Sequence, residues 1–185
     1  MSSVPFQTIM VAIDSTEVSH KAFEKAISIA KALDAKLFIS HVLSFRDVDS
    51  PQPIHSYSTP GTIVIDEAIR QKYQQQWNDY IEHYEALLKQ KLEKAQSRGV
   101  DAESIQPQGA IGRVLCETAR TLDVDLLIVG SHQRRGISEL MMGSTSNYIM
   151  HHAPCSVLVV HPHTVPQTTR EDVDAPASSK EMIGV

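Results

Sequence analysis

Short apolar runs alternate with amphipathic segments along this chain, and this alternation is the strongest constraint on its fold. Four of the runs are nearly continuous, as expected for strands buried on both faces of a parallel sheet. They cover residues 8–13, 36–43, 125–130 and 156–161, and a weaker candidate covers residues 100–106. Strands that alternate with helices are typical of α/β proteins with right-handed crossovers. The sequence therefore predicts an open five-stranded parallel sheet with helices on both faces.

Four helices are expected between these strands. Apolar residues recur at helical spacing over 22–33, 66–98, 114–122 and 144–152. The longest pattern ends at Gly99, a residue suited to terminate a helix. A long loop is predicted at residues 44–66, which contain three prolines and several serines, and loops of this length tend to be functional or mobile.

Length and composition point to one globular domain. We assign it to residues 6–162 and predict a flexible tail at 163–185, where no periodicity is found. The net charge of −5 argues against a general nucleic-acid binder. No apolar run approaches the ~20 residues needed to cross a membrane. The N-terminus lacks the features of a secretory signal, so we expect a cytoplasmic protein.

The residues that follow the strands are the first place to look for a ligand site. In open α/β sheets, ligands bind beyond the carboxyl ends of the strands, where the strand order reverses. Asp14, residues 41–44 and the segment starting at Gly130 occupy such positions. The polar stretch 14–17 also suits a helix N-cap, and for Asp14 taken alone we favour that interpretation.

The segment from Gly130 to Ser146 has the composition of a phosphate cradle. Glycine lets the backbone turn sharply or approach a ligand closely, and Gly143 precedes a helix that opens with Ser144, Thr145 and Ser146. Unpaired amides at a helix start favour an anion, especially a phosphate. The alternative is purely structural: Gly130 only turns the chain, and Ser144 only caps the helix.

The same segment resembles the signature of the universal stress protein family, G-x2-G-x9-G-(S/T). Gly130 and the pair Gly143-Ser144 match at the correct spacing, whereas Gln133 replaces the middle glycine. The resemblance extends over residues 6–161 and includes four further motifs: Asp14-Ser15, His41-Val42, Asp125-Leu126 and residues 153–160. It implies a Rossmann-like fold of the adenine nucleotide alpha hydrolase type.

The resemblance also implies a binding site for ATP with Mg²⁺, with AMP and ADP as alternative ligands. Asp14 and Ser15 would contact the ribose or the adenine edge, and Val42 would pack at the base. The phosphates and ribose would be held by a larger set: Gly130, Gly143, Ser144, Thr145 and Ser146, with His132 and Gln133 in the intervening loop. Gln133 either donates its amide to a phosphate or narrows the pocket.

Three functions are compatible with this sequence. We favour a regulatory protein that binds ATP and acts through its conformation or through partner contacts. The alternative is a nucleotide-free dimeric module that pairs through the apolar strand 157–160, and a slow nucleotide hydrolase is the third. We assign no catalytic residues, because Walker and nucleophile-elbow motifs are absent. No metal ligands are assigned either, since the histidines and the two cysteines lack suitable spacing.

Overall fold

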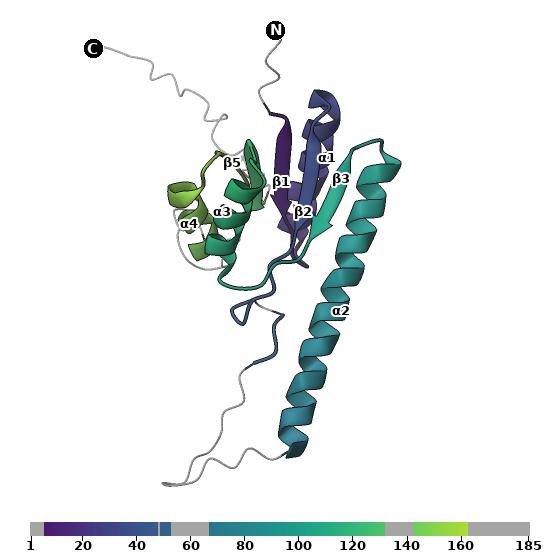
Figure 1. Cartoon of the computed structure of the whole chain (residues 1–185), viewed down its shortest axis with the longest axis vertical. Helices are drawn as coiled ribbons and strands as arrows, with labels where there is room; N and C mark the ends of the chain where they lie inside the picture. Colours follow the sequence, from purple (N-terminus) through teal and green to yellow (C-terminus); the bar gives the residue numbers. More distant parts are fainter. Residues whose placement is uncertain (1–5, 48, 53–66, 132–142, 163–185) are drawn as a thin grey trace, which may run out of the picture.

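The fold is an α/β sandwich built on one parallel sheet (Figure 1). The computed structural model describes residues 6–47, 49–52, 67–131 and 143–162. All sheet pairs are parallel, and the strand order is β3-β2-β1-β4-β5. The strands are β1 (Thr8–Ala12), β2 (Lys36–Ser40), β3 (Ala102–Ile105), β4 (Leu126–Gly130) and β5 (Ser156–Val160). This architecture confirms the predicted fold class.

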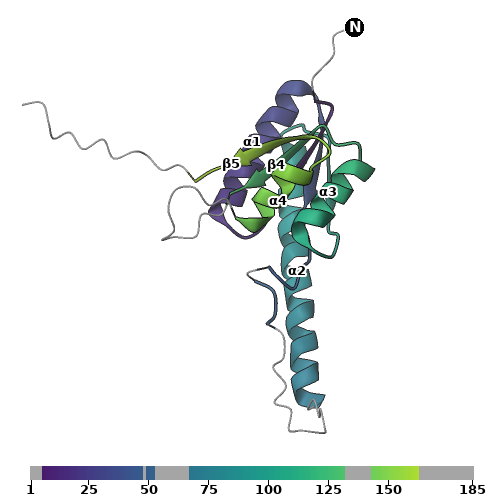
Figure 2. The same ribbon diagram turned by 90° about the vertical axis from the view of Figure 1, so that its left-hand side faces the viewer.

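Helices cover both faces of the sheet (Figure 2). They are α1 (Glu17–Leu33), α2 (Glu67–Ser97), α3 (Ile111–Thr121) and α4 (Ser144–His152). One core cluster joins the sheet to α1 and α2, through residues such as Phe23 and Leu88. A second cluster joins the opposite face to α3 and α4, through residues such as Leu115 and Ile149. The alternation of side chains along each buried strand supplies both clusters.

Strand boundaries are shorter than the apolar patterns predicted. β2 ends at Ser40, whereas the sequence pattern continued to residue 43. After Ser40 the chain leaves β1 but stays beside the end of β3: the His41 and Leu43 N–H groups donate to the Ile105 and Pro107 oxygens. Leu43 also forms an isolated parallel bridge to Gln108. The residues 41–43 are nevertheless well packed, since His41 and Val42 are buried. The segment therefore keeps part of its pairing with the β3 side beyond the end of β2, and burial of Val42 accounts for its apolar character.

Helix α2 is much longer than the sheet is tall. Its C-terminal half packs on the sheet with Leu88 and Ala95, and Gly99 follows it with a φ of 78°. Its N-terminal half extends past the carboxyl ends of the strands, beside the described part of the β2–α2 connection (Figures 1 and 2). No helix among the residues described is both long enough and apolar enough to cross a membrane.

The strand order reverses between β1 and β4. From β1 the chain proceeds to β2 and β3 on one side, whereas β4 and β5 lie on the other. The ends of β1 and β4 are direct neighbours, with Val11 paired to Ile128. A topological switch point of this kind is where open α/β sheets bind their ligands. It brings the turn after β1 next to Gly130, although the two are far apart in the sequence.

Candidate functional site

The turn after β1 is organised by Asp14. Its Oδ1 accepts hydrogen bonds from the Thr16 backbone N–H at 2.8 Å and from the Thr16 hydroxyl at 2.6 Å. The Asp14 N–H in turn donates to Ser19 Oγ at 2.8 Å. Thr16, and not Asp14, is the N-cap of α1, because its side chain accepts from the Ser19 N–H. The alternative interpretation of Asp14 as the cap is therefore wrong, and its carboxylate instead supports the cap.

Gly130 ends β4 against the first turn of α1. A Cβ at this position would lie 3.0 Å from Val18 Cγ1 and 3.4 Å from the Ser19 nitrogen. The glycine thus allows α1 to pack close to the switch point, as small residues do where a helix crosses a strand end. Gly130 consequently has a packing role that the sequence pattern did not reveal.

The start of α4 lies beside the end of β4. The buried Ser146 hydroxyl donates to the Gly130 carbonyl oxygen at 3.2 Å and so ties the helix to the strand. Gly143 is the N-cap, and the first backbone bond of the helix runs from the Asn147 N–H to the Gly143 oxygen. The amides of the three preceding helical residues therefore have no partner within the helix. Ser144 is exposed and Thr145 partly exposed, which leaves this helix start accessible.

Three buried polar atoms at the same edge of the sheet belong to residues that the predicted site did not include. Ser131 Oγ, Ser40 Oγ and His41 Nδ1 are buried and have no hydrogen-bond partner in the part of the chain that the structure describes. Ser131 directly follows Gly130, and its N–H pairs with the Val160 oxygen. Buried polar atoms normally find partners, so unpaired ones point to a water or a ligand. Ser131 lies inside the glycine motif, and this position is the sequence feature that could have identified it as a candidate site residue.

Two carboxylates attach the segment after β2 to helix α2. Asp47 Oδ2 accepts from the Tyr80 hydroxyl at 2.7 Å and lies 3.2 Å from His41 Nε2. Asp49 Oδ2 accepts from the Tyr84 hydroxyl at 2.7 Å. The His41 ring stacks on Tyr84 with 3.6 Å between ring centroids. We call residues 44–47 and 49–52, which carry both carboxylates, the strap.

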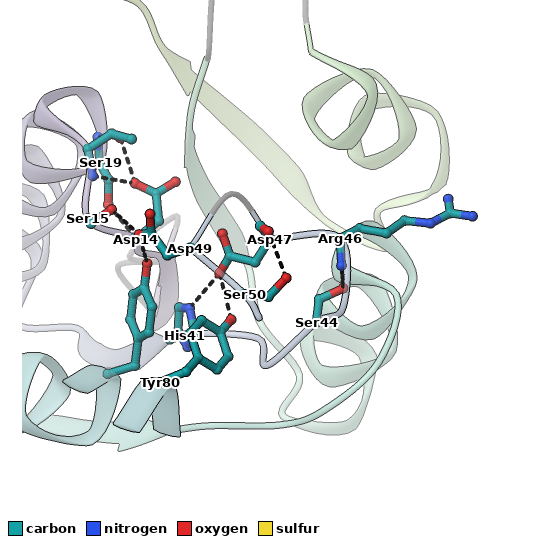
Figure 3. A network of polar contacts seen from close by, with 12 residues as sticks. Asp14, Ser15, Ser19, His41, Ser44, Arg46, Asp47, Asp49, Ser50 and Tyr80 are labelled. Carbon is teal, nitrogen blue, oxygen red and sulfur yellow. Dashed lines mark hydrogen bonds and ion pairs between the residues drawn. The ribbon is translucent and has the colours of Figure 1, made fainter. Parts of the chain in front are cut away.

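Asp49 also reaches the turn after β1. Ser15 Oγ donates to Asp49 Oδ2 at 2.5 Å, so one carboxylate oxygen joins the turn and helix α2. Figure 3 shows Asp47 and Asp49 on the side of the strap that faces Asp14 and Ser15, whereas Arg46 points away. The carboxylates make this end of the site strongly acidic. The sequence placed these residues in a long loop and gave no reason to connect them with Ser15.

The environment of the two tyrosines keeps them protonated. Burial raises the pKa of Tyr80 above its ordinary value, and the Asp47 carboxylate beside it raises that pKa further. Burial likewise raises the pKa of Tyr84; the neighbouring Ser15 hydroxyl opposes this rise, while the Asp49 carboxylate adds to it. Both phenols therefore remain hydrogen-bond donors to the strap throughout the ordinary pH range.

We expect the free energy of unfolding to fall as the pH rises above about 10. A tyrosine in the unfolded chain deprotonates there, whereas the folded protein holds Tyr80 and Tyr84 neutral to higher pH. Each group then contributes a slope of up to about 1.4 kcal/mol per pH unit. Denaturant unfolding between about pH 8 and 11 should show a shallower alkaline decline for Tyr80→Phe than for the wild type. Tyr148→Phe, at an exposed tyrosine, serves as the control, and equal slopes for all three proteins would contradict the prediction.

The structure thus brings together most of the residues that the sequence predicted. Asp14 and Ser15 lie after β1, Gly130 ends β4, and the predicted helix start forms the N-terminus of α4. Val42 is buried in the second core cluster, beside Met10 and Phe38. His132 and Gln133 lie outside the described residues, so their predicted roles remain untested.

The strand order and the helix start at the switch point define a Rossmann-like α/β protein. The model of the "Universal stress protein family" matches residues 5–161. The chain therefore belongs to the universal stress protein family, as its motifs had indicated.

Relatives and solved structures agree with this assignment. Universal stress protein YxiE of Bacillus subtilis is 30% identical over 155 residues, covering 84% of this chain and 99% of its own. A universal stress protein solved in complex with cAMP is 24% identical, with a TM-score of 0.56 and coverage of 84% of this chain and 97% of its own. A family protein of Arabidopsis thaliana with AMP bound is 20% identical, with a TM-score of 0.56 and coverage of 85% and 93%. These structural similarities establish the shared fold.

Proposed function

We propose that this protein binds an adenine nucleotide at the switch point between β1 and β4. The observation that carries the proposal is the glycine-flanked, accessible start of α4 fastened to the end of β4 by the bond from Ser146 to Gly130. A helix start with unpaired amides attracts phosphate through its N–H groups and its positive dipole end. The AMP and cAMP in the two structural neighbours support the choice of an adenine nucleotide.

The residues present fit such a ligand. The amides at the start of α4, together with the Ser144 and Thr145 hydroxyls, would hold the phosphates. The buried Ser131 Oγ, which has no hydrogen-bond partner among the described residues, lies close by, directly after the end of β4. Asp14 and Ser15 would contact the ribose or the adenine edge at the neighbouring strand end. In the described ranges, no group of three histidine, cysteine or acidic side chains is arranged to hold a metal. We therefore propose that Mg²⁺ enters with ATP, bound through the phosphates.

The proposed biological role is regulatory. Nucleotide binding would shift the population between conformations, and a partner would recognise one of them. We propose that this takes place in the cytoplasm. A ligand changes such an equilibrium only as far as it binds the two conformations with different affinities.

Calorimetric titration of the full chain with ATP plus Mg²⁺, AMP and cAMP tests the proposal directly. We expect saturable binding with one site per chain for at least one of the three nucleotides. Mass spectrometry of the denatured supernatant should also find nucleotide that co-purifies with the protein. Absence of binding to all three, with a correctly folded sample, would reject the nucleotide site.

A dimer through β5 is a second proposal, which is compatible with the first. β5 is one of the two edge strands of the described sheet, and Val157, Leu158 and Val159 remain partly exposed there. An exposed apolar edge strand is a template for pairing with another chain. Light scattering should give twice the mass of one chain, and Leu158→Lys should restore the monomer mass. A wild type with the mass of a single chain would reject the dimer.

A further inference from the structure

The hydroxyl of Ser15 is hydrogen-bonded to the strap. It donates to Asp49 Oδ2 at 2.5 Å, and the same oxygen accepts from Tyr84 on α2 at 2.7 Å. A serine hydroxyl has a single proton, so Ser15 donates one hydrogen bond at a time. A ligand that takes this proton must displace Asp49.

The strap itself is held at more than one point. Asp47 is fixed by Tyr80 and His41, and the Ser50 N–H and hydroxyl both bond to the Asp47 carbonyl oxygen. Loss of the bond between Ser15 and Asp49 therefore leaves the Asp47 end attached. The Asp49 end would then be held to the rest of the protein by Tyr84. Such partial release is a local change and leaves the sheet intact.

The strap lies where a binding partner could contact it, so a partner could distinguish the attached from the released Asp49 end. It lies along the part of α2 that extends past the sheet, and Phe45 of the strap stacks edge-on against Trp77 at 4.7 Å between ring centroids. Phe45 is 59% exposed. Trp77, Tyr80 and Tyr84 follow one another at ring distances of 5.3 and 5.2 Å. An aromatic row thus connects the Asp49 contact with the exposed surface of the strap.

We propose that Asp49 couples the nucleotide site to the strap and to α2, by competing with the nucleotide for the Ser15 hydroxyl. The inference rests on the proposed function, because it requires that the nucleotide accepts a hydrogen bond from the Ser15 hydroxyl. Asp49 acts as a positioning residue through Ser15. Nucleotide binding releases Asp49 from the turn after β1, and the loosened Asp49 end of the strap, next to the aromatic row, is the signal that a partner detects. By linkage, a partner that favours the released strap raises the affinity for nucleotide.

A mutant cycle on the full chain tests the competition. Asp49→Ala should raise the affinity for ATP about three- to tenfold, since one hydrogen bond no longer has to be broken. The same substitution in a Ser15→Ala background should leave the affinity unchanged within about twofold, because no hydroxyl remains to be released. Asp101→Ala removes an exposed carboxylate just before β3 and serves as the matched charge control; we expect wild-type affinity.

Hydrogen exchange of residues 44–52 gives the second measurement. ATP should accelerate exchange there in the wild type, whereas Asp49→Ala should exchange rapidly with and without ATP. Equal gains in affinity from Asp49→Ala in both backgrounds would show a charge effect and overturn the inference, as would exchange that ATP leaves unchanged. The affinity measurement and the exchange measurement both require a wild type that binds ATP. A wild type without ATP affinity would overturn the proposed site for ATP, and the coupling with it.

Discussion

Substitution of Gly143 by valine is expected to weaken nucleotide binding about 30-fold while leaving the fold intact. Gly143 is the N-cap of α4, where a branched side chain would occupy the space in front of the amides that have no partner within the helix. Contact between a phosphate and a helix start contributes up to about 2 kcal/mol, which corresponds to the expected loss of affinity. The backbone accepts the change, since φ −56° and ψ 153° are allowed for any residue.

A matched control exists at the other end of the same helix. Ala153 is the C-cap, with φ −62° and ψ 139°, close to the values at Gly143. Ala153→Val therefore introduces the same side chain on a similar backbone, away from the proposed phosphate position. Titration calorimetry should give wild-type affinity for Ala153→Val. Unchanged affinity in Gly143→Val, together with binding by the wild type, would remove the start of α4 from the site.

Substitution of Gly130 by valine is expected to lower the free energy of unfolding by about 3 kcal/mol, even without nucleotide. The first added carbon already lies 3.0 Å from Val18 Cγ1 and 3.4 Å from the Ser19 nitrogen. Overpacking of this kind costs about 1–3 kcal/mol, and the branched side chain places this variant at the upper end. Denaturant unfolding of the nucleotide-free protein measures the loss.

A rescue experiment separates packing from ligand binding at Gly130. Gly130→Ala should lower the free energy of unfolding by about 1 kcal/mol. A second substitution, Val18→Ala, removes the atom that the new Cβ contacts and should therefore restore most of the lost stability. The Val18→Ala single variant provides the reference. Wild-type stability of both Gly130 variants would show that α1 has room to move and that the glycine is not required for packing.

The family motif located Gly130 and Gly143 but did not indicate how each is packed. Both were identified from the spacing of the family signature, and both lie at the switch point as expected. The motif treats them alike, yet the structure gives them different surroundings. Gly130 is packed against α1, whereas Gly143 opens a helix beside accessible residues. The distinction depends on Val18, which lies far away in the sequence.

Turn chemistry was predicted only in part. The sequence indicated that residues 14–17 start a helix, which is correct, but not which side chain caps it. Asp14, Ser15 and Thr16 are all favourable N-cap residues by type. The choice of Thr16 depends on where α1 begins relative to the end of β1. That geometry also frees Ser15 to reach the strap.

The sequence by itself determined the class of fold, the order of its elements and the location of the proposed site. These depend on local patterns: the period of apolar residues, the residue types in turns, and a glycine motif with fixed spacing. Only the tertiary structure decided which distant residues meet. Asp47 reaches Tyr80, and Ser15 reaches Asp49 and through it Tyr84, over separations of 33 to 35 residues. Such contacts follow from the packing of α2 beside β2 and β3, and no local periodicity encodes them.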